Sequence, residues 1–274
     1  MPAIRRPLSL GRLLAETFDL YRHNFLLFLG ISAIPNGVLL LILILFDKTL
    51  GTIRNGVGIL GALEALFTIV AIVLVPSIVT AATTFAVSDV CLEQTTSIKS
   101  SFSRVSGKVL KILAVSFILG LIVGLGLLMF LAPGVYWVGV FGLAIPAVVL
   151  ENIPVGHALP RSSDLTQGFR PRVIIVFFLP WIFSGITRYF LNARLLWLWP
   201  IIHPHLVHLT ELNLRDISSV LATTLFGPIS AIGLTLTYYD LRVRKETFDL
   251  MMDLMGGAET VAAEGIQQST VGSQ

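Results

Sequence analysis

Six long apolar stretches divide the chain between residues 24 and 239, and short polar segments separate them. A helix needs roughly 20 apolar residues to cross the ~30 Å hydrocarbon layer of a bilayer. Backbone groups in lipid must find hydrogen-bond partners within their own segment, which favours helices for such stretches. The pattern therefore predicts an all-α polytopic transmembrane bundle of six spans, which we place at residues 24–46, 62–87, 109–131, 134–150, 173–191 and 217–239.

A shorter segment with apolar residues at helical spacing precedes each odd-numbered span. The apolar positions are Leu10, Leu13, Leu14, Phe18 and Tyr21 in the first segment, Ile98, Phe102 and Val105 in the second, and Ala158, Leu165 and Phe169 in the third. Aligning Leu20, Val105 and Leu165 superposes three copies of a short helix followed by two spans. We therefore expect three repeated hairpins, each preceded by a cytoplasmic amphipathic helix. The alternative is that the short segments are cytoplasmic extensions of the spans.

The composition agrees with a location in a membrane. Charged residues make up 13% of the chain and hydrophobic residues 55%, with a mean hydropathy of +0.86, whereas soluble domains contain about 25% charged residues. We expect a single transmembrane domain over residues 1–255, followed by a disordered tail over residues 256–274 that is rich in Gly, Ala, Ser, Gln and Glu. Cys91 is the single cysteine, which excludes an internal disulfide.

Most of the 19 Lys and Arg residues lie beside alternate gaps between the spans. They gather in the N-terminal segment, in the second and fourth loops, and after the last span. Because cytoplasmic loops carry the excess of basic residues, this pattern predicts a multi-pass protein of the inner (plasma) membrane with both termini in the cytoplasm. The net charge of +3 follows the same pattern, so we expect no nucleic-acid partner.

Three basic residues of the cytoplasmic segments are candidates for contact with lipid headgroups, namely Arg104, Lys108 and Arg161. A helix in the membrane interface buries its apolar side at the acyl boundary and holds Lys and Arg near anionic headgroups. We therefore expect the lipid bilayer as a partner. The pattern also leaves open a protein partner or a homo-oligomer.

A group of imidazole and carboxylate side chains lies in the fifth loop, where His205, His208 and Glu211 follow His203 at spacings of two or three residues. On a helix, His205 and His208 would be neighbours, a spacing compatible with binding a metal ion. The alternative is an interfacial loop, since Trp197 and Trp199 just before it are typical of the aromatic belt at headgroup level. Because Pro204 interrupts the group, we favour the interfacial loop and expect neither a metal nor another cofactor.

Five of the predicted spans contain a proline: Pro35, Pro76, Pro146, Pro180 and Pro228. Broken helices of this kind expose backbone carbonyl groups at the binding sites of many transporters. Proline is also commoner in membrane helices than in soluble ones. The prolines therefore keep a small-solute transporter or channel as an alternative function.

The stretch Glu151–Asn152 and the sequence Ala158-Leu-Pro-Arg-Ser-Ser-Asp-Leu-Thr-Gln-Gly168 form a motif between the fourth and fifth predicted spans. It resembles the A-L-x-R-S-x-x-L-T-x-G loop of a bacterial integral membrane family that is similar to the membrane domain of glycerophosphoryl diester phosphodiesterases. Residues 16–25 and 238–246 fit the same family, and the resemblance covers residues 8–255. Pro160 stands where a polar or basic residue is usual. The resemblance implies a membrane module without the soluble catalytic domain.

No catalytic motif is found in the sequence: there is no G-x-S-x-G, no H-E-x-x-H and no P-loop. Together with the repeated basic segments, this favours a non-enzymatic membrane module that acts through lipid or protein contacts. A small-solute transporter or channel is the alternative.

Overall fold

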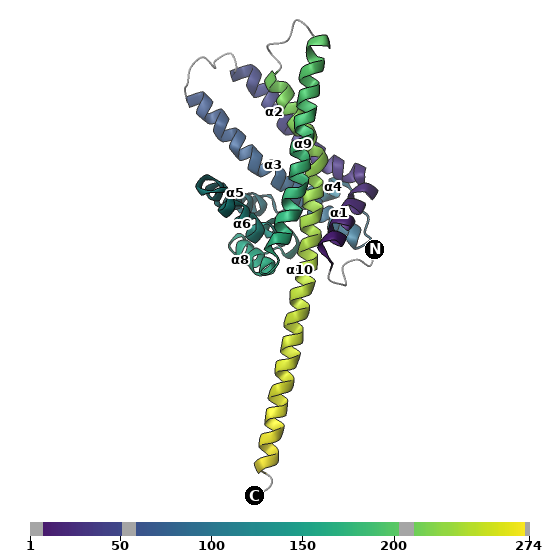
Figure 1. The fold of residues 1–274 in the computed structure, drawn as a ribbon, viewed down its shortest axis with the longest axis vertical. Helices are drawn as coiled ribbons and strands as arrows, with labels where there is room; N and C mark the ends of the chain where they lie inside the picture. The colour runs from purple at the N-terminus through teal and green to yellow at the C-terminus, as the bar shows by residue number, and fades with distance from the viewer. Residues whose placement is uncertain (1–7, 51–58, 203–210, 272–274) are drawn as a thin grey trace.

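The computed structural model describes residues 8–50, 59–202 and 211–271, and this part of the chain contains helices but no strands (Figure 1). The helices are α1 (Leu10–His23), α2 (Phe25–Leu50), α3 (Ile59–Cys91), α4 (Ile98–Ser106), α5 (Val109–Met129), α6 (Leu131–Phe141), α7 (Ala144–Glu151), α8 (Val155–Thr166), α9 (Arg170–Ile202) and α10 (Glu211–Val271). Six stretches in the described residues are long and apolar enough to cross a membrane, and they overlap the six predicted spans. The chain is therefore a multi-pass membrane protein with an all-α fold.

The fourth predicted span, residues 134–150, is not one continuous helix. Its first part lies in α6, which ends at Phe141, and its second part is α7, which begins at Ala144. Pro146 explains the break, because its ring would meet the carbonyl of Gly142, four residues earlier, in a continuous helix. Starting a new helix at Ala144 places Pro146 in the first turn, where a backbone N–H has no helical partner to lose.

The three short helices are separate from the spans, in agreement with the predicted repeat. Asn24 separates α1 from α2, and Gly107 and Lys108 separate α4 from α5. Gly168, which has a positive φ of 84°, lies between α8 and α9. The positions aligned from the sequence share one environment, since Leu20, Val105 and Leu165 are all buried. The chain therefore folds as three hairpins, α2–α3, α5–α6–α7 and α9–α10, each preceded by a short helix.

The second member of each hairpin lies inside the molecule and the first lies outside. In the apolar windows of α2, α5 and α9, 22% of the residues are buried, compared with 56% for α3, 56% for α6–α7 and 44% for α10. The inner helices α3, α7 and α10 contact one another. Between residues 228 and 241, every residue of α10 is buried apart from the half-buried Ser230 and Tyr239. The core is therefore built on three inner helices, with α10 the longest of them.

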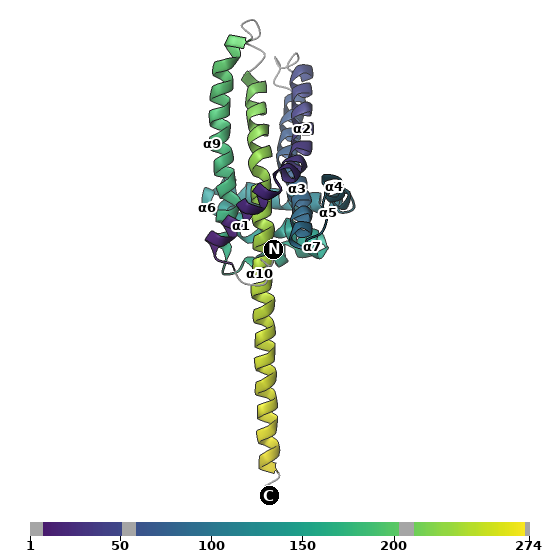
Figure 2. The ribbon, with the colours of Figure 1, turned by 90° about the vertical axis from the view of Figure 1, so that its right-hand side faces the viewer.

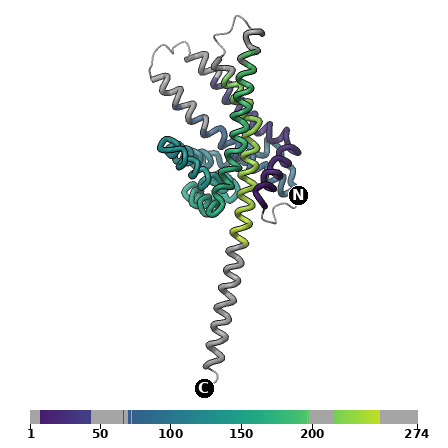
Figure 3. The backbone as a smooth tube through the Cα atoms, in the orientation of Figure 1, coloured from purple at the N-terminus to yellow at the C-terminus, as the bar shows by residue number. Residues whose placement is uncertain are grey.

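Each short helix packs on the inner helix of the preceding hairpin. Helix α4 contacts α3, and α8 contacts α7. Helix α1 completes the pattern by packing on α10, the last inner helix, and Figure 3 shows it on the side of α10 opposite α5 and α6. The three repeats therefore form a closed ring in which the first repeat meets the third. We call the contact between the first hairpin, α2–α3, and the third, α9–α10, the closing seam.

The hairpins do not all run in one direction. Helices α9 and α10 follow the long axis of the molecule, whereas α5 and α6 run across it, as the two perpendicular views show (Figures 1 and 2). Large apolar side chains at the far end of the α5–α6 hairpin, including Leu128, Phe130 and Leu131, are exposed. Apolar side chains exposed on a membrane protein are the surface that lipid covers.

The segment from residue 256, predicted from its composition to be disordered, belongs to α10 in the structure, because this helix extends to Val271. The sequence from Ala258 to Glu264 contains no proline and is rich in Ala and Glu, which favour helices. Adding such residues to an existing helix also avoids the unfavourable nucleation step.

A buried carboxylate holds the ring closed. Asp240 accepts a hydrogen bond from the backbone N–H of Leu8 at 2.6 Å and pairs with Arg172 at 2.9 Å and Arg244 at 3.0 Å. Both arginines also donate to the carbonyl of Leu8, at 2.6 and 2.7 Å. The carboxylate is 1% exposed and the Arg172 side chain 10%. The start of the first repeat is therefore bound to the end of the last.

Replacing Asp240 by alanine is expected to lower the free energy of unfolding by about 3–5 kcal/mol, because two arginines would keep their charge without the buried partner. The free energy can be measured by titrating the protein in mixed micelles with a denaturing detergent. Asp19→Ala is the matched control, since its carboxylate is 50% exposed and pairs with His23 within one helix; we expect a change within about 0.5 kcal/mol. Equal losses in both variants would contradict a special role for Asp240.

Candidate functional site

Each inner helix carries an acidic residue that binds a neighbouring repeat. Asp89 near the end of α3 pairs with Arg104 of α4. Glu151 at the end of α7 pairs with Arg161 of α8 at 2.8 Å. Asp240 of α10 binds Leu8 before α1, as described above. Three acids at related positions thus bind the three short helices or the residues beside them.

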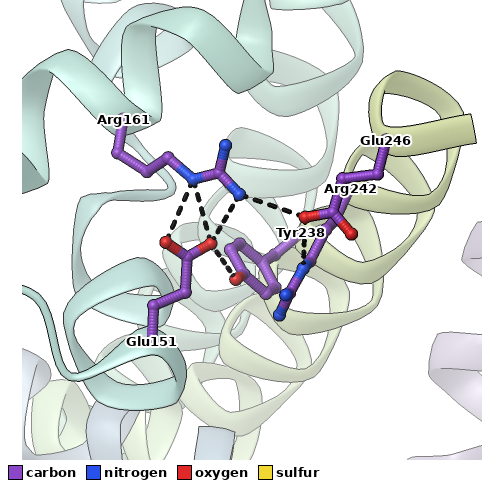
Figure 4. Close-up of polar contacts among 5 residues, drawn as sticks. All are labelled: Glu151, Arg161, Tyr238, Arg242 and Glu246. Atoms are coloured by element: carbon purple, nitrogen blue, oxygen red, sulfur yellow. Dashed lines mark hydrogen bonds and ion pairs between the residues drawn. The ribbon is translucent and has the colours of Figure 1, made fainter. Parts of the chain in front are cut away.

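The Glu151 contact is the most elaborate of the three (Figure 4). The Nε of Arg161 donates to both carboxylate oxygens, at 2.9 and 3.0 Å, and Nη2 donates to Oε1. The hydroxyl of Tyr238 on α10 also donates to Oε1. Glu246 accepts from Arg161 at 3.4 Å and from Arg242 at 2.7 Å. The hydrogen bond to Glu151 raises the pKa of Arg161, which therefore keeps its charge.

The predicted headgroup contacts Arg104, Lys108 and Arg161 all have partners within the protein. Besides Asp89, Arg104 lies over the ring of Phe85, 4.8 Å from its centre. Lys108 donates to the carbonyl of Val149 at 2.8 Å, near the C-terminal end of α7, where a cation interacts favourably with the helix dipole. Burial, and then the nearby Lys111 and Arg104, lower the pKa of Lys108. These contacts give the three residues structural roles, and their contact with lipid stays a prediction.

The weak metal candidates fall at the edge of the structure. His205 and His208 lie outside the described residues, and Glu211 is the first residue of α10, where its side chain is not described. Within the described part of the chain, no three His, Cys, Asp or Glu residues are grouped so that they could hold a metal ion.

A cavity of about 300 Å³ lies in the closing seam, between α2 and α3 of the first hairpin and α9 and α10 of the third. Apolar walls come from Val79, Phe177, Phe226 and Leu234. Trp181 stands at the cavity with 66% of its surface exposed, so the opening faces the surroundings of the bundle. The exposed side chains of α9 around this opening, such as Trp181 and Ile182, are apolar. A molecule dissolved in the membrane could therefore enter the cavity through the lipid-facing surface of the bundle.

Uncharged polar groups also line the cavity. Five are hydroxyl groups, and the sixth is the amide of Asn36, which donates to Ser32 Oγ at 3.1 Å. Ser32 and Asn36 are buried, and Ser184 is 9% exposed. Thr80 and Thr223 bond to carbonyl groups of their own helices. Among the described residues, the hydroxyl groups of Ser184 and Ser230 have no hydrogen-bond partner, which leaves them available to a ligand.

The cavity lies deep in the apolar part of the bundle. Ser230 and Thr223 precede the buried Asp240 by ten and 17 positions on α10, which corresponds to roughly 15 and 25 Å along a helix. Prolines lie at the same depth: Pro76 and Pro180 line the cavity, and Pro228 follows Gly227 in its wall. Each proline leaves the carbonyl four residues earlier without its usual helical hydrogen bond.

Helix α1 connects the ring closure to the cavity wall. The hydroxyl of Tyr21 donates to the carbonyl of Leu225 at 2.7 Å, next to Phe226 of the wall. Burial raises the pKa of Tyr21 to about 12, so this hydroxyl keeps its proton at ordinary pH and remains a donor. The position of α1 is therefore coupled to the part of α10 that carries Pro228.

Comparison of the chain with protein-family models, with curated proteins and with solved structures found no match. The resemblance to the phosphodiesterase membrane domain therefore stays a prediction that rests on the quoted motifs.

The roles of the acids Asp89 and Asp240 and of the polar cavity residues were not predicted from the sequence. The signal for the acids was available, because each lies at the end of an even-numbered span, as Glu151 does. The cavity gave no such signal, because Ser, Thr and Asn are common within membrane helices at packing positions. Only the prolines pointed to this part of the spans.

Replacing Arg161 by glutamine is expected to lower the free energy of unfolding by about 1–3 kcal/mol, because Glu151 would lose its charged donor while staying half-buried. The matched control is Arg242→Gln, which removes a more exposed pair within α10 and should change the free energy by less than about 0.5 kcal/mol. Detergent titration measures both. If Arg161→Gln instead left stability unchanged and reduced copurifying anionic lipid, Arg161 would act on headgroups.

Proposed function

We propose that this protein is a non-enzymatic membrane module that binds a lipid-soluble molecule in the cavity of the closing seam. The cavity is the observation that carries the proposal. Its volume of about 300 Å³ lies at the lower end of the range for small-molecule sites, roughly 300–1,000 Å³. Apolar walls with a few polar groups are the usual make-up of such sites.

The surroundings of the cavity favour a ligand that arrives through the bilayer. Trp181 and Thr223 are exposed beside it, on helices long and apolar enough to span a membrane. No side chain that lines the described cavity is charged, so an ionic solute would lose its hydration without gaining an opposite charge. An uncharged, largely apolar molecule avoids this cost.

The module would lie in the inner membrane of a bacterium with both termini in the cytoplasm. Basic residues near the meeting point of the inner helices support this orientation, because cytoplasmic segments carry such residues in excess. Helices α1, α4 and α8 would then lie at the cytoplasmic interface, where exposed cations such as Lys99 face anionic headgroups. The resemblance to a phosphodiesterase membrane domain agrees with a module that has no catalytic role of its own.

A second candidate function is transport of a small uncharged molecule. Transporters commonly bind their substrates near the bilayer midplane, at the boundary between repeats and beside broken helices. The cavity lies at the boundary between the first and third repeats, and Pro76 and Pro180 line it. Uptake into proteoliposomes separates the two functions, because a binding module would retain its ligand without moving it.

Replacing Gly227 by leucine is expected to abolish ligand retention. A Cβ atom at Gly227 would point toward the cavity, 3.8 Å from Ser32 Oγ, so there is room for the first carbon and the longer side chain would fill the space. Native mass spectrometry of protein extracted gently from its own membrane should show a bound small molecule in the wild type. We expect at least a tenfold lower occupancy in Gly227→Leu.

Two variants control this experiment. Gly124→Leu makes the same change on α5, where a Cβ atom would meet nothing within 4 Å, and it should keep the ligand. Gly227→Ala should also keep it, because one methyl group makes only ordinary contacts there. Equal occupancy in Gly227→Leu and Gly124→Leu, or an empty wild-type protein, would rule out the cavity as a binding site.

A further inference from the structure

One polar side chain in the wall of the cavity, Asn36 of α2, has hydrogen-bonding capacity to spare. Its amide nitrogen donates one hydrogen bond to Ser32 Oγ, and both residues are buried. An amide can make four hydrogen bonds, two as donor and two as acceptor. Among the described residues Asn36 makes this one, and because it lines the cavity its remaining capacity is available to a ligand there. A buried amide with unused donors and acceptors is costly in an apolar setting unless a ligand or water satisfies it.

The depth of this amide limits what can bind it. Asn36 lies 11 positions after Phe25, the first residue of α2, which corresponds to roughly 16 Å along the helix. This is about half of the ~30 Å hydrocarbon layer. Phospholipid headgroups lie at the surface of the bilayer, and bringing a phosphate to this depth without a cationic partner would be very unfavourable. The group that Asn36 meets must therefore be polar but uncharged.

The size of the cavity suggests how much of the ligand it encloses. A volume of about 300 Å³ is near the minimum for a drug-sized molecule. The exposed Trp181 lies at the opening, which faces lipid in a membrane. A long molecule can therefore place its polar end beside Asn36 and leave its apolar chain in the bilayer.

We propose that the cavity selects a chain lipid whose single polar end is an uncharged hydroxyl or carbonyl group, and that Asn36, supported by Ser32, is the residue that recognises this group. The inference rests on the proposed binding function and adds the chemical class of the ligand. Ser184 supplies a second hydroxyl from α9, so the ligand bridges the first and third hairpins. Charged lipids of the same chain length, such as fatty acids, are excluded.

Trp181 provides a direct test because it stands at the cavity. We would replace Trp137, Trp197 and Trp199 by phenylalanine, so that Trp181 is the remaining tryptophan of the full chain. The protein in bilayers of unbrominated phosphatidylcholine would be titrated with three brominated probes of equal chain length: a long-chain alcohol, the corresponding fatty acid carboxylate and the corresponding alkane. Bromine quenches the fluorescence of a nearby tryptophan. Adding Gly227→Leu to this protein measures the quenching that does not depend on the cavity.

We expect the alcohol to quench Trp181 saturably, at a concentration at least tenfold lower than the alkane or the carboxylate. Asn36→Leu should abolish the preference for the alcohol and leave quenching by the alkane unchanged. Ser32→Ala should reduce the preference, because Asn36 loses the partner that orients it. Thermal unfolding in detergent confirms that each variant is folded, and Ser32→Ala serves as the test if Asn36→Leu does not fold.

The outcomes separate this inference from the proposed function. If alcohol and alkane quench Trp181 equally, and Asn36→Leu and Ser32→Ala have no effect, the cavity binds chains without recognising a polar end and the inference is overturned. A preference for the carboxylate would overturn it as well. If no probe gives quenching that Gly227→Leu removes, the binding function itself is refuted.

Discussion

The carboxylate of Asp240 joins the first and last repeats, and the rest of the fold depends on this contact. Buried ions are stable only when charge and hydrogen bonds compensate them fully. Asp240 meets this condition through two arginines and the backbone N–H of Leu8. The same arginines donate to the Leu8 carbonyl, so the backbone N–H and the carbonyl of Leu8 both have hydrogen-bond partners. The contact with Asp240 positions α1 so that Tyr21 donates to the Leu225 carbonyl. Helix α1 therefore also stabilises the part of α10 that forms the cavity wall.

Local patterns in the sequence predicted the elements of the fold well. Spans and short helices follow from apolar runs and from helical periodicity, and the alignment of Leu20, Val105 and Leu165 found three positions that are buried alike. The break in the fourth span was not predicted although Pro146 lies within that span, because a proline does not always end a membrane helix: Pro35 and Pro76 lie inside continuous helices. The helical segment after residue 256 was missed because its composition, taken alone, is also typical of disorder.

The candidate site could not be predicted because it depends on contacts between distant segments. The Leu8–Asp240 bond joins residues 232 positions apart, and the cavity combines residues from four helices of two repeats. Asn36 and Ser184 look ordinary in sequence, since an amide or a hydroxyl in a membrane helix usually serves packing. Arg104, Lys108 and Arg161 were predicted to contact lipid headgroups, whereas the structure gives each a partner within the protein, and the pairing depends on how the repeats pack together.

The closed ring also determines the order in which the protein can be completed. Helix α1 is synthesised long before its partner α10, because 232 residues separate the two ends of the Leu8–Asp240 contact. At about 5–20 residues per second, α1 waits roughly 12 to 46 seconds before that partner leaves the ribosome. Its apolar face, with Leu13 and Leu20, is uncovered during this time. The membrane surface is the natural temporary cover for such a face, so the bilayer assists assembly before it serves as the final environment.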